Sequence, residues 1–146
     1  MAKKKKRRAR KKYEVDGITF DSKTEKVHYE ILSEHPLVEV LDVHKTFLLM
    51  DKFKYTRLPT FSNGTHRKMI YTPDFIIKVK GIDKPIAMET KGHPRKDYMI
   101  RKKLFTYFYG NEYYFYECKD KSSGEQLRKD LEVMTSERSK KNTKDS

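Results

Sequence analysis

Residues 71–92 constrain the fold more than any other part of this chain. The stretch YTPDFIIKVKGIDKPIAMETKG contains two short apolar runs joined by a glycine-containing turn. Runs of this length predict two buried strands, and the short turn predicts that the strands are antiparallel neighbours. A hairpin centred near Ile82 would bring the vicinity of Asp74 opposite that of Glu89. We therefore expect Asp74, Glu89 and Lys91 to converge at one end of an otherwise apolar sheet.

The flanking segments predict a mixed α/β domain. Tight-turn residues predict a hairpin around Asp16-Gly17, and Pro73 predicts a bulge or a sheet edge. Ser22 and Glu25 form a capping-box pattern at the start of a helix. In chain order we expect a helix over 21–36, a strand over 43–50, a solvent-facing loop or hairpin tip over 51–68, strands before and after Gly81, a helix over 93–110, a strand over 113–118 and a helix over 123–137. The helix over 93–110 is expected to bury Tyr98, Ile100, Leu104, Phe105 and Phe108.

The overall charge predicts a polyanionic partner. The 146 residues carry a formal net charge of +13. This surplus of Lys and Arg favours nucleic acid first and an anionic membrane surface second. No apolar stretch approaches the roughly 20 residues that span a bilayer, and no apolar run follows the basic N-terminus as in a signal peptide. Cys118 is the single cysteine, which excludes an internal disulfide, so we expect a cytoplasmic protein without a membrane partner.

The chain ends differ in composition from its middle. We expect a disordered basic arm over 1–12, a single domain over 13–135 and a flexible polar tail over 136–146. The segment KKKKRRARKK is a solubilising tail, a localisation signal or an arm that lies along phosphates. In the last case its DNA contacts are Lys3, Lys4, Lys5, Lys6, Arg7, Arg8 and Arg10.

Two carboxylates that meet at strand ends repel each other, and one would have to hold a proton. A divalent cation removes this repulsion, and magnesium takes carboxylate oxygens and binds phosphate oxygens alongside. In that interpretation Lys91 orients the attacking water or offsets negative charge. The simpler alternative is an exposed ion network of Glu89 and Lys91, with Asp74 as an ordinary turn residue. The apolar flanks, the basic chain and the adjacent Gly92 favour the metal site.

These residues resemble the signature of the PD-(D/E)xK nuclease superfamily, with Pro73-Asp74 as the PD and Glu89-Thr90-Lys91 as the ExK. The pattern is similar to small phage endodeoxyribonucleases and to Holliday-junction resolvases of the phage endonuclease I type. In those proteins a helix with a glutamate precedes a YTPDF…ETKG block. The resemblance covers roughly residues 13–118. It implies a restriction-endonuclease-like fold, an α/β fold with a mixed central sheet flanked by helices.

The resemblance also assigns roles to single residues. Glu25 matches the helical glutamate that completes the acidic cluster, although a helix cap also explains it. The metal ligands implied are Glu25, Asp74, Glu89 and the Thr90 carbonyl, and the catalytic set is Glu25, Asp74, Glu89 and Lys91. The residues themselves suggest further DNA contacts at His93, Arg95, Lys96, Arg101 and Lys102. His28 is expected to be a partly buried helix residue rather than a ligand.

The sequence thus predicts a magnesium-dependent DNA endonuclease, with manganese as a substitute. A dimeric resolvase of branched DNA such as a four-way junction is the favoured form, because two symmetric strands require two sites. The alternatives are a less selective phage DNA-processing endonuclease and a non-catalytic DNA-binding protein. A phage-encoded enzyme would act in the host cytoplasm.

Overall fold

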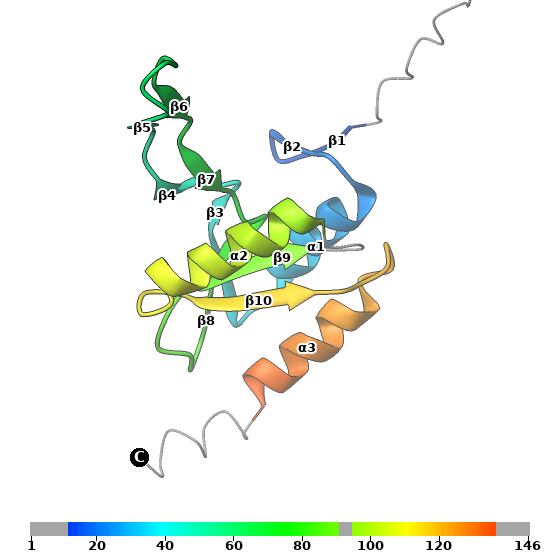
Figure 1. Ribbon diagram of the computed structural model, residues 1–146. Coiled ribbons are helices and arrows are strands. Elements are labelled where there is room, and N and C mark those ends of the chain that lie inside the picture. Colours follow the sequence, from blue (N-terminus) through cyan, green and yellow to red (C-terminus); the bar gives the residue numbers. More distant parts are fainter. Residues whose placement is uncertain (1–11, 91–94, 137–146) are drawn as a thin grey trace, which may run out of the picture.

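The computed structural model describes residues 12–90 and 95–136 (Figure 1). The described residues form a mixed α/β fold, as the sequence predicts. Its elements in chain order are β1 (Tyr13–Val15), β2 (Ile18–Phe20), α1 (Lys23–Glu34), β3 (Val38–Val43), β4 (Phe47–Met50), β5 (Phe53–Tyr55), β6 (Gly64–His66), β7 (Met69–Tyr71), β8 (Phe75–Val79), β9 (Ile86–Thr90), α2 (Lys96–Tyr109), β10 (Tyr114–Cys118) and α3 (Glu125–Thr135). The predicted basic arm, except Lys12, and nearly all of the predicted tail lie outside the described residues.

A four-stranded sheet in the order β10-β9-β8-β3 forms the centre of the fold. β8 and β9 pair antiparallel with Phe75 opposite Met88, while β9 and β10 run parallel. This register places Asp74 and Glu89 next to each other at one end of the two strands. The predicted hairpin is confirmed, with Asp74 beside Glu89, whereas the expected position of Lys91 lies outside the described residues.

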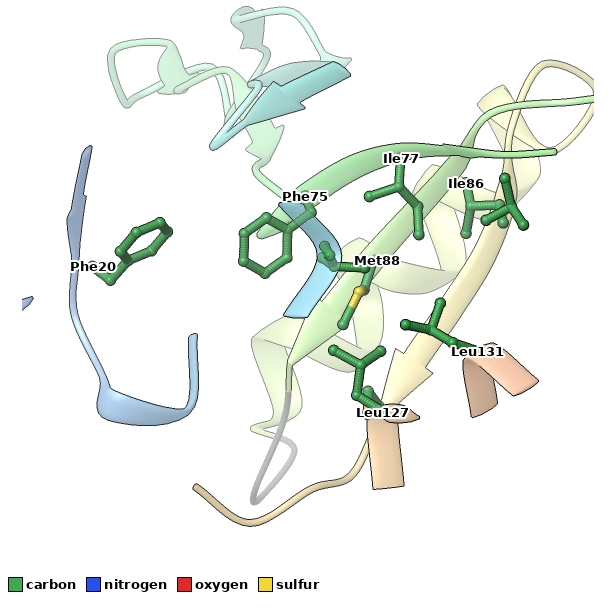
Figure 2. Close-up of a cluster of buried hydrophobic side chains, with 10 residues drawn as sticks. Phe20, Phe75, Ile77, Ile86, Met88, Leu127 and Leu131 are labelled. Carbon is green, nitrogen blue, oxygen red and sulfur yellow. The ribbon is translucent and has the colours of Figure 1, made fainter. Parts of the chain in front are cut away.

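The sheet is buried on both faces because successive residues of a strand point to opposite faces, and those of β8 and β9 are mostly apolar on both. On one face Phe75, Ile77 and Met88 pack with residues from α1 and α3, and Figure 2 shows Leu127 and Leu131 of α3 in this cluster. On the other face Ile76 and Ala87 pack with side chains of β4, β7 and α2. The sheet is therefore the middle layer, with α1 and α3 on one side and α2 on the other.

The expected single strand over 43–50 is wrong. The extended segment is interrupted between β3 and β4, where His44 takes a left-handed backbone conformation with a φ of 57°. β3 pairs with β8, whereas β4 pairs with β7 in a separate two-stranded sheet. The His44 N–H donates to the Asp74 carbonyl at 3.1 Å, so the two chain segments stay joined where they pass from one sheet to the other. The strand expected before Gly81, with a bulge or a sheet edge at Pro73, is instead two strands: β7 and β8 pair in different sheets and are separated by Thr72, Pro73 and Asp74.

The two predicted ends of α1 are confirmed. The Ser22 hydroxyl accepts the Glu25 N–H at 3.1 Å, and His35 precedes Pro36 as the C-cap. The turn before α1 places Asp16 and Gly17 at φ values of 53° and 77°, as a two-residue hairpin turn requires.

The buried stripe expected for α2 is only partly right. Tyr98 and Phe105 are buried, but Ile100 and Phe108 are each 54% exposed. The sheet contacts a narrow face of α2, so these two apolar side chains point to solvent. No helix in the described ranges 12–90 and 95–136 is both long and apolar enough to cross a membrane.

Candidate metal centre

Asp74 is a buried carboxylate at the start of β8. Its side chain is 7% exposed and accepts the Thr90 N–H at 2.7 Å, which ties it to the end of β9. Burial, and then repulsion by Glu89 and Glu25, raises the pKa of Asp74 well above its usual value of 3.8. The hydrogen bond from Thr90 opposes this shift but does not cancel it. The fold thus holds Asp74 where its charge is costly.

Glu89 lies on the α2 side of the sheet and is 6% exposed. The Tyr71 hydroxyl donates to its Oε2 at 2.7 Å. Burial, followed by the negative charge of Glu89 and this hydrogen bond, raises the pKa of Tyr71, so the hydroxyl keeps its proton and remains a donor. Tyr71 is itself buried, and it also fixes the orientation of a candidate ligand.

Glu25 reaches the same cluster from the first turn of α1. One of its oxygens accepts the N–H of Asp21, the residue before the N-cap, at 3.2 Å, so the side chain also stabilises the entry to the helix. The side chain also hydrogen-bonds with that of Asp74 and repels it electrostatically. The cap and the acidic cluster, which the sequence left as alternatives, are therefore compatible in one conformation.

His44 belongs to this cluster, although sequence reasoning did not select it. One ligand atom from each of Glu25, His44 and Asp74 lies within 4.8 Å of the others. His44 reaches this position because of the left-handed backbone between β3 and β4. A histidine with positive φ is uncommon, and such strain concentrates at functional sites. No signal in the local sequence distinguishes this bend from a continuous strand.

A hydrogen-bond network supports the centre from the side of α1. His28 is fully buried, with its Nδ1 2.7 Å from the Thr90 hydroxyl and its Nε2 2.9 Å from the Asp120 carboxylate. Burial lowers the pKa of His28, although Asp120 opposes the shift, so the neutral imidazole links the two partners. Asp120 also accepts the N–H groups of Lys121, Gln126 and Leu127. These contacts hold Thr90, and through its N–H they hold Asp74.

The residues present fit a hard divalent cation. Glu25, His44 and Asp74 offer ligand atoms within 4.8 Å of one another, and Glu89 lies close enough to Asp74 to repel it. Asp74 and Glu89 are both buried. Carboxylate oxygens suit magnesium and manganese, and His44 adds a nitrogen at the same position. A bound cation would neutralise the repulsion that raises the pKa of Asp74. The Thr90 carbonyl remains a predicted ligand, and Lys91 lies outside the described residues.

A family profile described as "Protein of unknown function (DUF1064)" matches residues 4–125. The chain belongs to the DUF1064 family. The matched segment includes Glu25, His44, Asp74 and Glu89, so the entire acidic cluster lies within the region that defines the family. No curated protein and no solved structure matches the chain.

The DNA contacts predicted for this DUF1064 protein divide into three groups. Lys3, Lys4, Lys5, Lys6, Arg7, Arg8, Arg10 and His93 lie outside the described residues. Arg95 and Lys96 are exposed at the start of α2 and are available to a partner. Arg101 and Lys102 are half-buried and engaged within the fold.

Two contacts account for this engagement on α2. Arg101 donates to the Ile70 carbonyl at 2.9 Å, and Lys102 pairs with Glu117 at 3.0 Å. Burial alone would raise the pKa of Glu117, but hydrogen bonds from Tyr98 and Lys102 hold it below the usual range. The structure therefore assigns Arg101 and Lys102 at least a structural role, which a basic helix pattern does not reveal.

Proposed function

We propose that this protein is a metal-dependent DNA endonuclease that hydrolyses phosphodiester bonds. One observation carries the proposal: Asp74 and Glu89 are buried side by side, and Glu25 reaches Asp74 from a separate helix. Buried carboxylates in mutual repulsion destabilise the fold unless something offsets the repulsion. A site that tolerates this cost is a candidate for binding a cation.

The chain's own residues divide the work in this proposal. Glu25, Asp74 and Glu89 hold a magnesium ion, which would supply an activated water and offset charge on the phosphate. Tyr71 orients Glu89, and Thr90 orients Asp74. Lys91, two residues after Glu89, is the candidate from sequence for positioning the attacking water.

Two further observations support DNA as the substrate. The chain carries a net charge of +13, and Arg95 and Lys96 are exposed on the helix that follows the candidate centre. The central sheet flanked by helices is compatible with the restriction-endonuclease-like fold that the PD-(D/E)xK resemblance implies. Within this chemistry we propose branched DNA as the preferred substrate and a two-fold dimer as the active form.

The test compares a four-way junction with a linear duplex of the same sequence, with magnesium and with EDTA. Magnesium-dependent paired nicks in the junction alone are the expected result. Glu89→Gln should abolish cutting and keep DNA binding, because it removes a ligand and a negative charge. Glu39→Gln, at an exposed position of β3, is the matched control and should cut as the wild type does.

Two other results would change the conclusion. Equal cutting of the junction and the duplex would refute the resolvase and favour a less selective phage DNA-processing endonuclease. Binding of both DNAs with no cutting in magnesium or manganese would refute the enzyme. The net charge of +13 would then favour a non-catalytic DNA-binding protein.

A further inference from the structure

Residues 51–68 form a hairpin, here called the projecting hairpin, that takes no part in the core. It contains β5 and β6, and every residue in it is exposed except Gly64. Figure 1 shows β5 and β6 standing away from the central sheet, connected to it through β4 and β7. An isolated two-stranded hairpin is at best marginally stable in water. Most of its side chains are therefore open to a partner, although Arg57 also contacts the hydroxyl of Tyr55 at 3.4 Å and lies over its ring.

The charge of the projecting hairpin selects the kind of partner. The segment contains one acidic residue, Asp51, and five basic ones: Lys52, Lys54, Arg57, Arg67 and Lys68. None of these five forms an ion pair with a carboxylate in the part of the chain that the structure describes. Elsewhere in the fold, cations such as Lys102 and Lys129 are paired with glutamates. A surface with five such cations fits a polyanion.

The rings of the projecting hairpin have two different surroundings. Phe53 and Tyr55 lie 5.1 and 4.6 Å from the His66 ring. Tyr55 also covers Gly64, where an added Cβ would clash with the tyrosine ring. These three rings hold the two strands together. Phe61, near the turn, is 60% exposed and forms no ring contact with any described residue.

A hairpin that carries both an exposed ring and exposed cations suits a nucleic acid with accessible bases. Bases stack on aromatic side chains without sequence preference, and Lys and Arg bind the phosphates. A base within a duplex presents no free face to such a ring. The tip of the projecting hairpin therefore fits single-stranded or branched nucleic acid better than a continuous duplex.

The projecting hairpin is directly connected to the candidate centre. β7 leaves it and ends at Tyr71, whose hydroxyl contacts Glu89, and Asp74 follows three residues later. On the other strand, β4 begins three residues after His44. A nucleic acid held by the hairpin is thus bound by a segment whose two ends both lead into the acidic cluster.

We propose that the projecting hairpin binds nucleotides without a base-pairing partner, with Phe61 stacked on a base and Lys54 and Arg57 on the adjoining phosphates. The choice of DNA rests on the proposed nuclease function, but the binding itself does not require cleavage. This contact would favour branched or single-stranded substrates near the cut.

The test measures binding by the full chain in EDTA, where metal-dependent cleavage cannot occur. The probes are a fluorescein-labelled single strand and the duplex of the same sequence. Phe61→Ala should weaken binding of the single strand by roughly 5- to 150-fold, the range for loss of one stacked base, and change duplex binding far less. Tyr107→Ala is the matched control, because Tyr107 is 81% exposed on α2 and should leave both affinities unchanged.

A second variant tests the cations. The double substitution Lys54→Gln with Arg57→Gln should weaken both probes and reduce the slope of log K against log salt by about 1.4 on the single strand. Lys80→Gln, which removes an exposed positive charge just after β8, is the control for the effect of net charge. An unchanged affinity and salt slope in the double variant, or an equal effect of Phe61→Ala on both probes, would overturn the inference.

These outcomes separate the hairpin from the nuclease. Wild type that never cuts but shows the expected binding losses refutes the nuclease and retains the hairpin contact. If the wild type cuts DNA while the hairpin variants bind it normally, the nuclease is retained and the hairpin contact is refuted. A change in oligomeric state by light scattering, with DNA affinity intact, would assign the hairpin to contacts between copies of the chain and refute the inference.

Discussion

Replacing Asp74 with asparagine should stabilise the metal-free protein while removing its response to magnesium. Asp74 and Glu25 offer oxygens within 4.8 Å of each other. At an effective dielectric constant of about 20, two unit charges at that separation repel by roughly 3.5 kcal/mol. Solvent around the half-buried Glu25 screens part of this energy, while the buried Glu89 adds to the repulsion. The amide oxygen of asparagine can still accept the Thr90 N–H.

We therefore expect Asp74→Asn to raise the free energy of unfolding by about 1–3 kcal/mol near pH 8 in EDTA, or roughly 3–10 °C in Tm. The sign of the pH dependence follows from the raised pKa of Asp74. Between the unfolded and folded pKa values the folded state binds more protons, so wild-type stability falls as pH rises. The advantage of the variant should shrink as pH falls toward about 4, the unfolded pKa of aspartate.

The assay is thermal unfolding followed by circular dichroism, with EDTA and with about 10 mM magnesium. Magnesium should raise the Tm of the wild type, because it binds only the folded state, and should not raise that of Asp74→Asn. Asp42→Asn, at an exposed position of β3, is the control and should change stability by less than about 0.5 kcal/mol. A variant less stable than wild type in EDTA across this pH range would refute the reasoning.

Three other predictions follow from the contacts around the centre. His28→Ala should lower the free energy of unfolding by roughly 3–5 kcal/mol in urea titrations, since it removes a fully buried ring and two hydrogen bonds. Because the pKa of His28 is lowered in the folded state, the wild type should lose its stability advantage over His28→Gln as the pH falls below about 6.5. A difference in unfolding free energy that does not change with pH would contradict this. Tyr71→Phe should raise the magnesium concentration for half-maximal cleavage about 10-fold, because Glu89 loses its orienting donor; an unchanged requirement would exclude that role. Lys102→Gln should reduce stability more than DNA affinity and Lys96→Gln should do the opposite, as measured by unfolding and by fluorescence anisotropy.

The part of the candidate site carried by β8 and β9 was predictable from sequence. A short turn around Gly81 fixes the register of a hairpin, and the register places Asp74 beside Glu89. The helix cap at Ser22 was predictable for the same reason, because a local pattern fixes a local contact. These inferences succeed where the interacting residues are close in sequence or joined by one tight turn.

The remaining parts depend on contacts between distant segments. His44 joins the cluster because β3 and β4 pair with different strands, and the apolar run from 37 to 50 does not encode that change of partner. His28 meets Thr90 and Asp120, which are 62 and 92 residues away in the sequence. Ile100 is exposed because only a narrow face of α2 contacts the sheet, whereas a periodic pattern predicts burial for the whole stripe.

The central claim is that carboxylates of α1, β8 and β9 bind one divalent cation. Crystals soaked in manganese test it most directly through the anomalous signal of the ion. The account predicts a peak about 2.1 Å from carboxylate oxygens of Asp74 and Glu89, with Glu25 in direct or water-mediated contact. A well-ordered site without a peak between these side chains, or a peak elsewhere on the protein only, would contradict it.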